Sequence, residues 1–318
     1  MKIFYISVIE LHKGWGSEHF INKGFLKLGH ETITLDYRKY RNRLGKEFLE
    51  IPNFDVIFLQ RGERFPTELI KSINRPRFYF ASELVQRRKD QDHLLKSGLF
   101  NHIFVHSNKC KEIILNRKWI TEDRISVLLS GFDEDVHFKI PNIKKDIDVL
   151  FVGSITNRRR EILDNLKKDF NLYEARAYGM EMTKLFNRAK IVLNIHAEDY
   201  LDTENRIYEA LGCSSFIITE KLSSENPFKT GVHLIESQNL DEMKDQIVHF
   251  LHNEDERKKI SDEGYKEAIS KHTYTKRAEE ILKIMNKYKI NFSIPAISNM
   301  KVKLFILLKP FIQLKYIR

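Results

Sequence analysis

Short apolar runs rich in β-branched and aromatic residues alternate with helix-compatible segments along most of this chain. In the first half we expect strands at 2–8, 31–35, 55–59, 78–81, 102–105 and 124–128, with helices at 17–28 and 108–116. The second half repeats the pattern, with strands at 149–152, 171–175, 191–193, 216–219 and 232–235 and helices at 159–168, 180–189, 241–252, 254–271 and 274–287. Strands that alternate with helices form βαβ units around a parallel sheet. The pattern predicts an α/β chain of two tandem Rossmann-like, doubly wound domains.

A polar stretch separates the two halves. GFDEDVHFKIPNIKKDID, at 131–148, contains Gly131 and Pro141 and has no clear period. A chain of 318 residues also exceeds what one hydrophobic core usually serves. We therefore expect an N-terminal domain at 1–140, a second domain at 141–290 and a tail at 291–318. Ligands of such domains lie at the carboxyl ends of the strands, in the cleft between the domains.

The positive charge is concentrated at the end of the chain. The net charge is +10, and eight cations without any acid fall between Ile281 and Arg318, which leaves +2 for the rest. A nucleic-acid footprint should follow a folded face, so we expect no nucleic-acid partner. The segment MKVKLFILLKPFIQLKYIR, interrupted at Pro310, has too short an apolar run to span a bilayer. Residues 296–318 suit an anionic membrane surface, and the alternative is a final helix packed against the body.

Other patterns argue against metal ions and disulfides. Cys110 and Cys213 lie far apart without a CxxC or a nearby histidine pair, which favours neither a disulfide framework nor a zinc site. Asp90-Gln91-Asp92 lies in a charged stretch of helical character, and Asp146-Ile147-Asp148 leads into a strand without a further ligand. We expect no metal role for either. The first residues indicate a strand and not a signal peptide, so we expect a cytoplasmic protein.

Two places in the second half suit an anion. Gly153 and Ser154 follow a strand and precede Arg158 and Arg159, a pattern typical of phosphate contacts, although basic triplets also occur on solvated helices. The segment from Ile191 to Thr219 indicates a strand, a loop, a short helix that opens near 203–205 and ends at Gly212, and a second strand. The N-terminus of such a helix favours a diphosphate.

Two side chains near that helix suit a binding role. Glu209 lies one turn after Asn205 on the same helix face, where its carboxylate could accept hydrogen bonds from a ribose. The alternative is a salt bridge on the helix surface. His196 follows the strand end, where it lines the cleft or is a simple loop histidine.

Several motifs together resemble one family. Three segments follow one another in an order that resembles the donor domain of GT-B glycosyltransferases, especially the group 1 and CgeB-like branch. They are VLFVGSITNRRREIL, EARAYGMEMTKLFNRAKIVLNIH and ENRIYEALGCSSFIIT. LLSGFDEDVHF, at 128–138, resembles the interdomain segment of that family, and GWGSEHFINKGFLKLGHETITL resembles the Gly-rich loop, helix and turn of its first domain. The similarity covers most of residues 124–285.

The resemblance implies metal-independent, retaining transfer of a sugar from a UDP-, GDP- or ADP-linked donor. The acceptor would be a glycan or lipid-linked molecule in cell-surface polysaccharide biosynthesis, and no cofactor beyond the donor is implied. By position, Glu209 would hold the ribose. The other implied contacts are Gly153, Ser154, Arg158 and Arg159 at the diphosphate, Tyr178 and Gly179 at the base, Asn205 and Arg206 at the phosphates or sugar, and Gly14, Gly16 and Ser17 over the reacting centre.

This chain departs from the family pattern in two places. Leu201 stands where retaining members often have the first glutamate of a pair, and Asp202 and Glu198 are out of register, which leaves the stereochemical course open. Many members have a histidine after the fourth strand, where this chain reads FASE. Glu83 lies there and His106 follows the next strand. Both are catalytic candidates, and the alternative for each is a structural role.

Two other readings of the sequence lead to different functions. A nucleotide-sugar epimerase uses the same fold, and it would convert the donor without an acceptor. A non-catalytic membrane or nucleic-acid adaptor would keep the fold without the activity. Removal of residues 291–318 would separate the adaptor from the enzyme, because only the adaptor would depend wholly on that tail.

Overall fold

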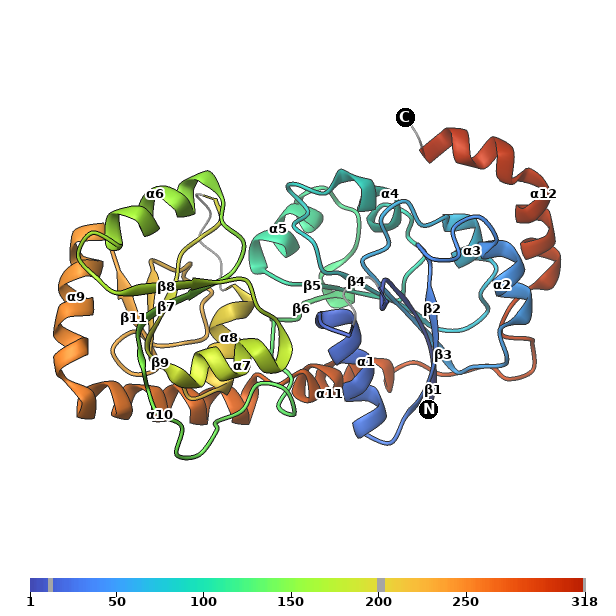
Figure 1. Cartoon of the computed structure of the whole chain (residues 1–318). Helices are drawn as coiled ribbons and strands as arrows, with labels where there is room; N and C mark the ends of the chain where they lie inside the picture. The colour runs from blue at the N-terminus through green and yellow to red at the C-terminus, as the bar shows by residue number, and fades with distance from the viewer. Residues whose placement is uncertain (11–13, 199–203, 317–318) are drawn as a thin grey trace. The chain divides into compact units, whose positions relative to one another are not determined.

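The computed structural model describes residues 1–10, 14–198 and 204–316, with only the backbone described at 310–316. The chain forms two compact units (Figure 1). Unit 1 comprises Met1–Leu129 and Arg277–Arg318, and unit 2 comprises Ser130–Lys276. Each is an α/β unit built on one parallel sheet, as the alternation of strands and helices predicts. The Asp202 and Leu201 positions of the sequence analysis lie outside the described residues.

Unit 1 is built on a six-stranded parallel sheet in the order β2-β1-β3-β4-β5-β6. The strands are β1 (Lys2–Ser7), β2 (Glu31–Asp36), β3 (Val56–Gln60), β4 (Arg77–Ala81), β5 (His102–Val105) and β6 (Ile125–Val127). The helices are α1 (Ser17–Lys27), α2 (Leu44–Glu50), α3 (Thr67–Lys71), η1 (Lys89–Gln91), α4 (Asp92–Leu95), α5 (Asn108–Asn116), η2 (Glu122–Arg124) and α12 (Asn299–Tyr316), and α11 (Tyr274–Met285) begins at the junction of the units.

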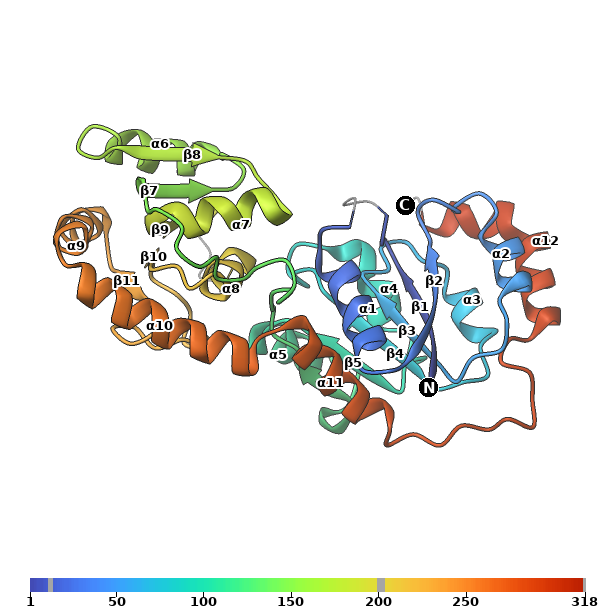
Figure 2. The same ribbon diagram turned by 60° about the horizontal axis from the view of Figure 1, so that its bottom comes forward.

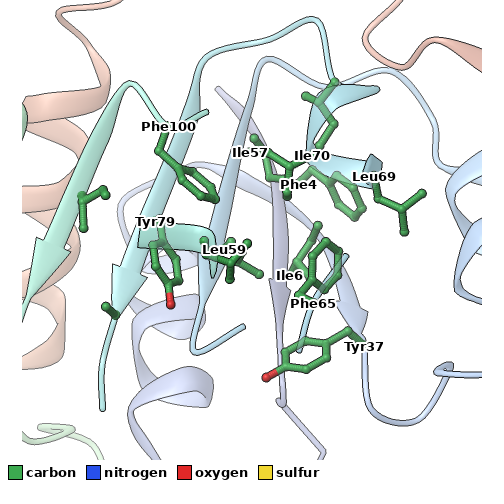
Figure 3. Close-up of a cluster of buried hydrophobic side chains, with 14 of the residues drawn as sticks. Phe4, Ile6, Tyr37, Ile57, Leu59, Phe65, Leu69, Ile70, Tyr79 and Phe100 are labelled. Carbon is green, nitrogen blue, oxygen red and sulfur yellow. The ribbon is translucent and has the colours of Figure 1, made fainter. Parts of the chain in front are cut away.

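Aromatic side chains dominate the core of unit 1 (Figure 3). Every residue of β3 is buried, as expected for a parallel strand covered on both faces. Tyr79 stacks on Phe100 with ring centroids 5.0 Å apart, and Phe4 meets Phe48 edge to face at 5.5 Å. These rings bury large apolar areas, which fixes the strands that carry the polar loops at the sheet edge.

The C-terminal part of the chain belongs to unit 1, which differs from the separate tail expected at 291–318. The side chain of Arg277 donates to Leu129 O at 2.9 Å, and the Tyr288 hydroxyl donates to Asn101 O at 3.0 Å. On α12, Val302 and Phe305 are buried in the core. The helix also continues through Pro310, where we expected an interruption.

Unit 2 has a five-stranded parallel sheet in the order β11-β10-β9-β7-β8. Its strands are β7 (Ile147–Val152), β8 (Leu172–Ala175), β9 (Ala189–Asn194), β10 (Ile217–Glu220) and β11 (Ile235–Ser237). Its helices are α6 (Asn157–Leu166), α7 (Gly179–Arg188), α8 (Asn205–Gly212), α9 (Leu240–His252) and α10 (Glu254–Lys271). Strand β11 begins where the expected strand 232–235 ends, because residues 229–234 form turns closed by Val232 N to Lys229 O and Gly231 N to Leu234 O.

Helices cover both faces of the unit 2 sheet. On β7, Leu150 and Val152 pack with α7 and α8, whereas Val149 and Phe151 pack with α6 and α9. Figure 2 shows α6 and α7 on opposite sides of β7. In both units the first strand is internal, with the second strand on one side and the third on the other. Ligands of doubly wound sheets bind outside the carboxyl ends of the strands at this reversal of order.

No helix among the described parts of the chain is long and apolar enough to cross a membrane.

Candidate functional site

The reversal point of unit 2 brings Gly153 and Arg206 together. Gly153 follows β7 with φ +155° and donates its N–H to Ala175 O at 2.9 Å. A Cβ atom at this position would lie 2.3 Å from Nη2 of Arg206. A side chain here would displace the guanidinium group, so glycine permits its close approach to the backbone. The sequence suggested that Gly153 admits a ligand, and the structure places a protein cation at the same spot.

Arg206 holds a fixed positive charge in the first turn of α8. Its Nη1 donates to Asn194 Oδ1 at 3.1 Å and to Glu204 Oε2 at 3.2 Å, and its guanidinium carbon lies 4.8 Å from the Phe151 ring centroid. Burial lowers the pKa of Arg206, and the charge of Glu204 opposes this effect. Because a guanidinium remains protonated in proteins, the site keeps one cation beside the helix N-terminus.

Arg159 forms hydrogen bonds with three separate loop segments. It is 3% exposed, and it donates from Nε to Ile195 O at 2.8 Å and from Nη1 to Ser154 O at 2.9 Å. Its Nη2 donates to both carboxylate oxygens of Glu204, at 2.8 and 3.0 Å. The guanidinium is thus committed to acceptors of the protein itself. Direct contact of Arg159 with a diphosphate stays a prediction, whereas its positioning of the loops is a structural fact.

Arg158 and its neighbour Arg160 face different partners. Arg158 forms a bidentate pair with Glu220, at 2.8 and 2.5 Å, and also donates to His196 O at 3.0 Å. Arg160 is exposed and pairs with Asp164 and Glu174. The basic triplet therefore divides into two side chains at the reversal point and one on the helix surface.

Glu204 is the central acid of this site, although the sequence pattern did not indicate it as a site residue. It directly precedes α8 and accepts from Arg159, from Arg206 and from Ala197 N. Burial alone would raise the pKa of Glu204, but the nearby His196 imidazole and the charges of Arg206 and Arg159 lower that pKa to about 2. The acid was visible in the sequence just before the helix, but its partner Arg159 lies 45 positions earlier, so only the fold pairs them.

His196 is a buried tie between two loops. Its backbone N–H donates to Glu220 Oε2 at 2.7 Å, and its Nε2 lies 2.9 Å from Lys221 O, an acceptor to which it must donate. Its Nδ1 lies 3.8 Å from Glu204 Oε1. Burial would lower the pKa of His196, but the interactions with Glu204 and with Lys221 O raise it overall. Glu204 therefore stabilises the protonated imidazole relative to a free histidine.

Glu209 lies behind the start of α8, on the helix that Asn205 opens. Asn205 is exposed and Glu209 is half-buried. Burial raises the pKa of Glu209 to about 7, and the charge of Arg206 opposes that shift only in part. A carboxylate held in a close ion pair would have a lowered pKa. The surface salt bridge considered for Glu209 is therefore disfavoured, and its carboxyl group is poised to ionise near neutral pH.

Tyr178 presents an uncovered ring at the same edge of the sheet. It follows β8, caps α7 and is 56% exposed, and the next residue, Gly179, is buried with φ +55°. Ile155, in the loop after the neighbouring strand β7, is also exposed. Exposed aromatic and apolar side chains offer a stacking surface for a planar base. Ser154, also exposed, lies between Ile155 and Gly153, the residue that Arg206 approaches.

The corresponding edge of unit 1 is rich in carboxylates. Arg61 follows β3 with φ +67° and pairs with Glu18 at 3.3 Å, Glu63 at 2.9 Å and Glu83 at 2.7 Å. The Tyr37 hydroxyl donates a short hydrogen bond to Glu63. Glu83, the catalytic candidate after β4, has a third of its side chain exposed. It is thus oriented by Arg61 while remaining accessible.

The other unit 1 candidates lie around the starts of two helices. Gly14 and Gly16 have φ +87° and +138° and lead into α1, and Ser17 Oγ accepts from Gln60 Nε2 at 2.8 Å. The Gly-rich loop is therefore anchored to the end of β3. His106 follows β5, and its Nδ1 lies 4.0 Å from Cys110 Sγ on α5. The geometry thus joins Ser17 and Glu83 to one polar edge and places His106 beside α5.

The four acids with DxD spacing lie beside cations. Asp90 pairs with Arg88, Asp92 with Lys96 and Arg117, Asp146 with Arg188 and Asp148 with Lys190. In the described segments 1–10, 14–198 and 204–316, no three His, Cys, Asp or Glu side chains are grouped as metal ligands.

Comparison with known proteins agrees with this architecture. Residues 140–283, just under half of the chain, match the family model described as "Glycosyl transferase-like". No curated protein matches the sequence significantly. Among solved structures, sucrose-phosphate synthase from Thermosynechococcus elongatus superposes with a TM-score of 0.66 at 9% identity, covering 90% of this chain and 98% of that one.

Two further solved structures are similar over nearly the whole chain. A glycosyltransferase from Rickettsia africae has a TM-score of 0.65 at 14% identity, covering 90% of this chain and 98% of that one. Anabaena HepE in complex with UDP has a TM-score of 0.63 at 13% identity, covering 91% and 100%. At these identities the similarity establishes the fold. The chain has the two-domain α/β fold of GT-B glycosyltransferases, and the glycosyltransferase-like segment 140–283 covers most of unit 2 and the first residues of the C-terminal part of unit 1.

Proposed function

We propose that this protein is a glycosyltransferase that uses a nucleotide sugar as donor. The observation that carries the proposal is the Arg206 guanidinium, held against Gly153 beside the N-terminus of α8 at the reversal point of the unit 2 sheet. The match of residues 140–283 to a glycosyltransferase-like family supports the same reading. UDP-linked donors come first, because the similar HepE structures contain UDP and UDP-glucose.

The proposed donor position assigns one part of the nucleotide to each group. Arg206 and the N–H groups at Asn205 meet the diphosphate, since the first N–H groups of a helix have no partner within the helix. Glu209 accepts hydrogen bonds from the ribose, and Tyr178 stacks with the base. Arg159 and Arg158 position the loops through Glu204 and Glu220. His196 joins these loops to each other.

The chemistry follows from charge development on the leaving group. The bond between the anomeric carbon and the diphosphate oxygen breaks, and the acceptor hydroxyl oxygen bonds to that carbon. Arg206 and the helix N–H groups stabilise the nucleoside diphosphate as it departs, so the proposal requires no metal ion and no other cofactor. We propose retention of configuration, with the acceptor proton passing to the leaving diphosphate and Glu83 orienting the acceptor hydroxyl.

The acceptor and location belong to the same proposal. We propose a glycan or lipid-linked acceptor of cell-surface polysaccharide synthesis, reached from the cytoplasmic face of a membrane. The carboxylate-rich edge of unit 1 supports a neutral hydroxyl acceptor there, because Glu83 can accept its hydrogen bond. Residues 296–318 provide the contact with an anionic membrane surface.

The donor site is tested by titrating the full-length protein with UDP-, GDP- and ADP-sugars in a calorimeter. One donor should bind, and Glu209→Ala should weaken it about tenfold through loss of the ribose contact. Unchanged affinity in that variant would remove the ribose role. Incubation with the donor alone distinguishes an epimerase, which would convert it in the absence of acceptor.

A further inference from the structure

A groove opens beside helix α12 of unit 1, on segments that the proposed donor site does not use. Its volume is about 400 Å³. The charged lining consists of Lys71, Arg77, Lys301 and Glu68. The apolar lining consists of Leu99, Leu304, Phe305 and Leu308. Three cations against one acid, beside four apolar side chains, match a molecule with an anionic head and an apolar body.

The groove contains a partly buried arginine, Arg77, with a hydrogen-bond donor that is unsatisfied within the described part of the chain. It is the first residue of β4, and its Nη1 donates to the carbonyls of Ile73 and Ile70 at 3.3 and 3.5 Å. Its Nε is buried without a hydrogen-bond partner among the described residues. Burial lowers the pKa of Arg77, with no opposing contribution from an acid. A partly buried guanidinium of this kind is costly unless an anion from outside accepts its hydrogen bonds.

The helix that borders the groove has a second, uncovered apolar face. Val302 and Phe305 face the core, but Met300, Leu304, Leu307 and Leu308 are 77%, 54%, 74% and 43% exposed. Lys301 alternates with these residues and donates from Nζ to Lys71 O at 3.2 Å. Single exposed apolar residues are ordinary, but four on one basic helix form a patch that suits an interface.

We propose that this groove binds the phosphate headgroup of an anionic lipid in a bilayer. Arg77 meets the phosphate at the base of the groove, Lys71 and Lys301 flank it, and Leu304, Leu307 and Leu308 enter the interfacial layer. The C-terminal segment, with eight cations and no acid, adds attraction to the same surface. The inference deepens the proposed membrane contact, on which it rests, and does not depend on sugar transfer.

Arg77 and Lys301 could instead have a purely structural role, and variants can distinguish that role from lipid binding. Arg77 and Lys301 both donate to carbonyls at the end of α3, which would stabilise that helix end without any lipid. Arg77→Gln removes the charge and leaves a shorter polar side chain, so its melting temperature, compared with that of the parent protein, reports any loss from these carbonyl contacts. Leu307→Gln alters the exposed face without touching the groove cations. Lys258→Gln, at an exposed position of α10, is the matched control for net charge.

The test is co-sedimentation of the full-length protein with vesicles of phosphatidylcholine alone or mixed with phosphatidylglycerol. We expect binding to the mixed vesicles, weakened about fivefold by Arg77→Gln and by Leu307→Gln and unchanged by Lys258→Gln. Equal weakening in Arg77→Gln and Lys258→Gln would overturn the specific site. So would equal binding to both vesicle types.

Two further measurements distinguish a lipid phosphate from free phosphate and separate lipid binding from donor binding. Inorganic phosphate should not release the protein from mixed vesicles, and it should not raise the melting temperature of the parent protein above that of Arg77→Gln. If it does both, the groove is a free-phosphate site and the lipid proposal fails. Nucleotide-sugar binding measured on the same variants should be unchanged. Weakened vesicle binding with intact donor binding is the expected result for Arg77→Gln. Absent donor binding in the parent protein would count against sugar transfer alone.

Discussion

The two units share one topology but arrange their charges differently at the reversal point of their sheets. In unit 2, two acids pair with three arginines: Glu204 pairs with Arg159 and Arg206, and Glu220 pairs with Arg158. In unit 1, three acids, Glu18, Glu63 and Glu83, pair with Arg61, and Glu63 also lies near Arg38 and Arg88. The backbone arrangement creates a place for a ligand in both units, and the side chains decide its charge. This difference favours the proposed diphosphate site in unit 2 and the proposed hydroxyl acceptor in unit 1.

The first turns of α1 and α8 repeat this difference on a smaller scale. Glu18, in the first turn of α1, is buried and contributes its own carboxylate to the positive end of the helix. Helix α8 begins with exposed Asn205 and then Arg206, and the acid that directly precedes it, Glu204, is paired with Arg159 and Arg206. The start of α8 therefore keeps a cation for an incoming anion, whereas the start of α1 carries a carboxylate within the helix itself.

The largest expected effect concerns the unit 1 cluster. Arg61→Ala leaves three carboxylates without their common cation, so the free energy of unfolding should fall by about 3 kcal/mol. Urea denaturation measures this change, and Arg41→Ala, at an exposed position, is the control. A loss no larger than that of the control would mean that the cluster is not held by Arg61.

The next largest effect concerns the affinity of unit 2 for the nucleotide sugar. Arg206→Ala removes the charge beside Gly153, so affinity for the nucleotide sugar should fall about 30-fold, as expected for one charge-assisted contact. Calorimetry with the full-length protein measures it. Arg160→Ala is the matched control, because Arg160 lies in the same basic triplet but pairs on the surface. Equal effects in the two variants would contradict the proposed role of Arg206.

A smaller effect concerns the ionisation of Glu209. Its pKa is raised to about 7, and the ionised form is the better hydrogen-bond acceptor for a ribose. Donor affinity should therefore rise about tenfold between roughly pH 6 and pH 8, since a nucleotide-sugar diphosphate has no second ionisation in that range. Glu209→Gln should remove the dependence. A pH profile that persists in this variant would assign the titration to another group.

The same shift has a consequence for stability without ligand. Because the folded-state pKa of Glu209 is raised, its contribution to stability is present below its ordinary pKa and is lost as pH rises through about 7. Melting temperatures of the parent protein and Glu209→Gln should accordingly converge at low pH and separate at high pH. Parallel curves would show that Glu209 titrates normally.

The smallest effect sharpens the assignment of unit 1 to the acceptor. Glu83→Gln weakens one hydrogen bond to the acceptor hydroxyl, so kcat/KM for the acceptor should fall about fivefold while donor affinity stays constant. Initial rates at varied acceptor and saturating donor separate the two. A parallel fall in donor affinity would place Glu83 at the donor site instead.

Sequence periodicity predicted most of the sheet strands because parallel strands buried on both faces form distinct apolar runs. The strand at 102–105 has the bounds observed for β5, and helix 254–271 has those of α10. Short helices such as α3 and α4, with five and four residues, offer too few turns for a period to be recognised. The return of residues 277–318 to unit 1 depends on long-range packing, which no local pattern encodes.

The residues of the candidate site were proposed from the sequence, but their pairings were not. Gly153, Arg206 and Glu209 were named from spacing and resemblance, yet the closeness of Gly153 to Arg206 appears only in the folded sheet. Glu204 was overlooked because an acid before a helix is ordinary, and its partners come from another loop. The basic triplet likewise gave no sign that Arg159 is buried while Arg160 is exposed.

One measurement tests the central claim most directly: a nuclear magnetic resonance titration of the ¹⁵N-labelled full-length protein with UDP-, GDP- and ADP-sugars. The account predicts that one of these donors shifts the backbone amides of Gly153, Asn205 and Arg206 in a saturable manner, and that Arg206→Ala abolishes saturation at the same concentration. Absence of shifts at these three amides with every donor, or shifts confined to unit 1, would contradict the assignment of the donor to unit 2.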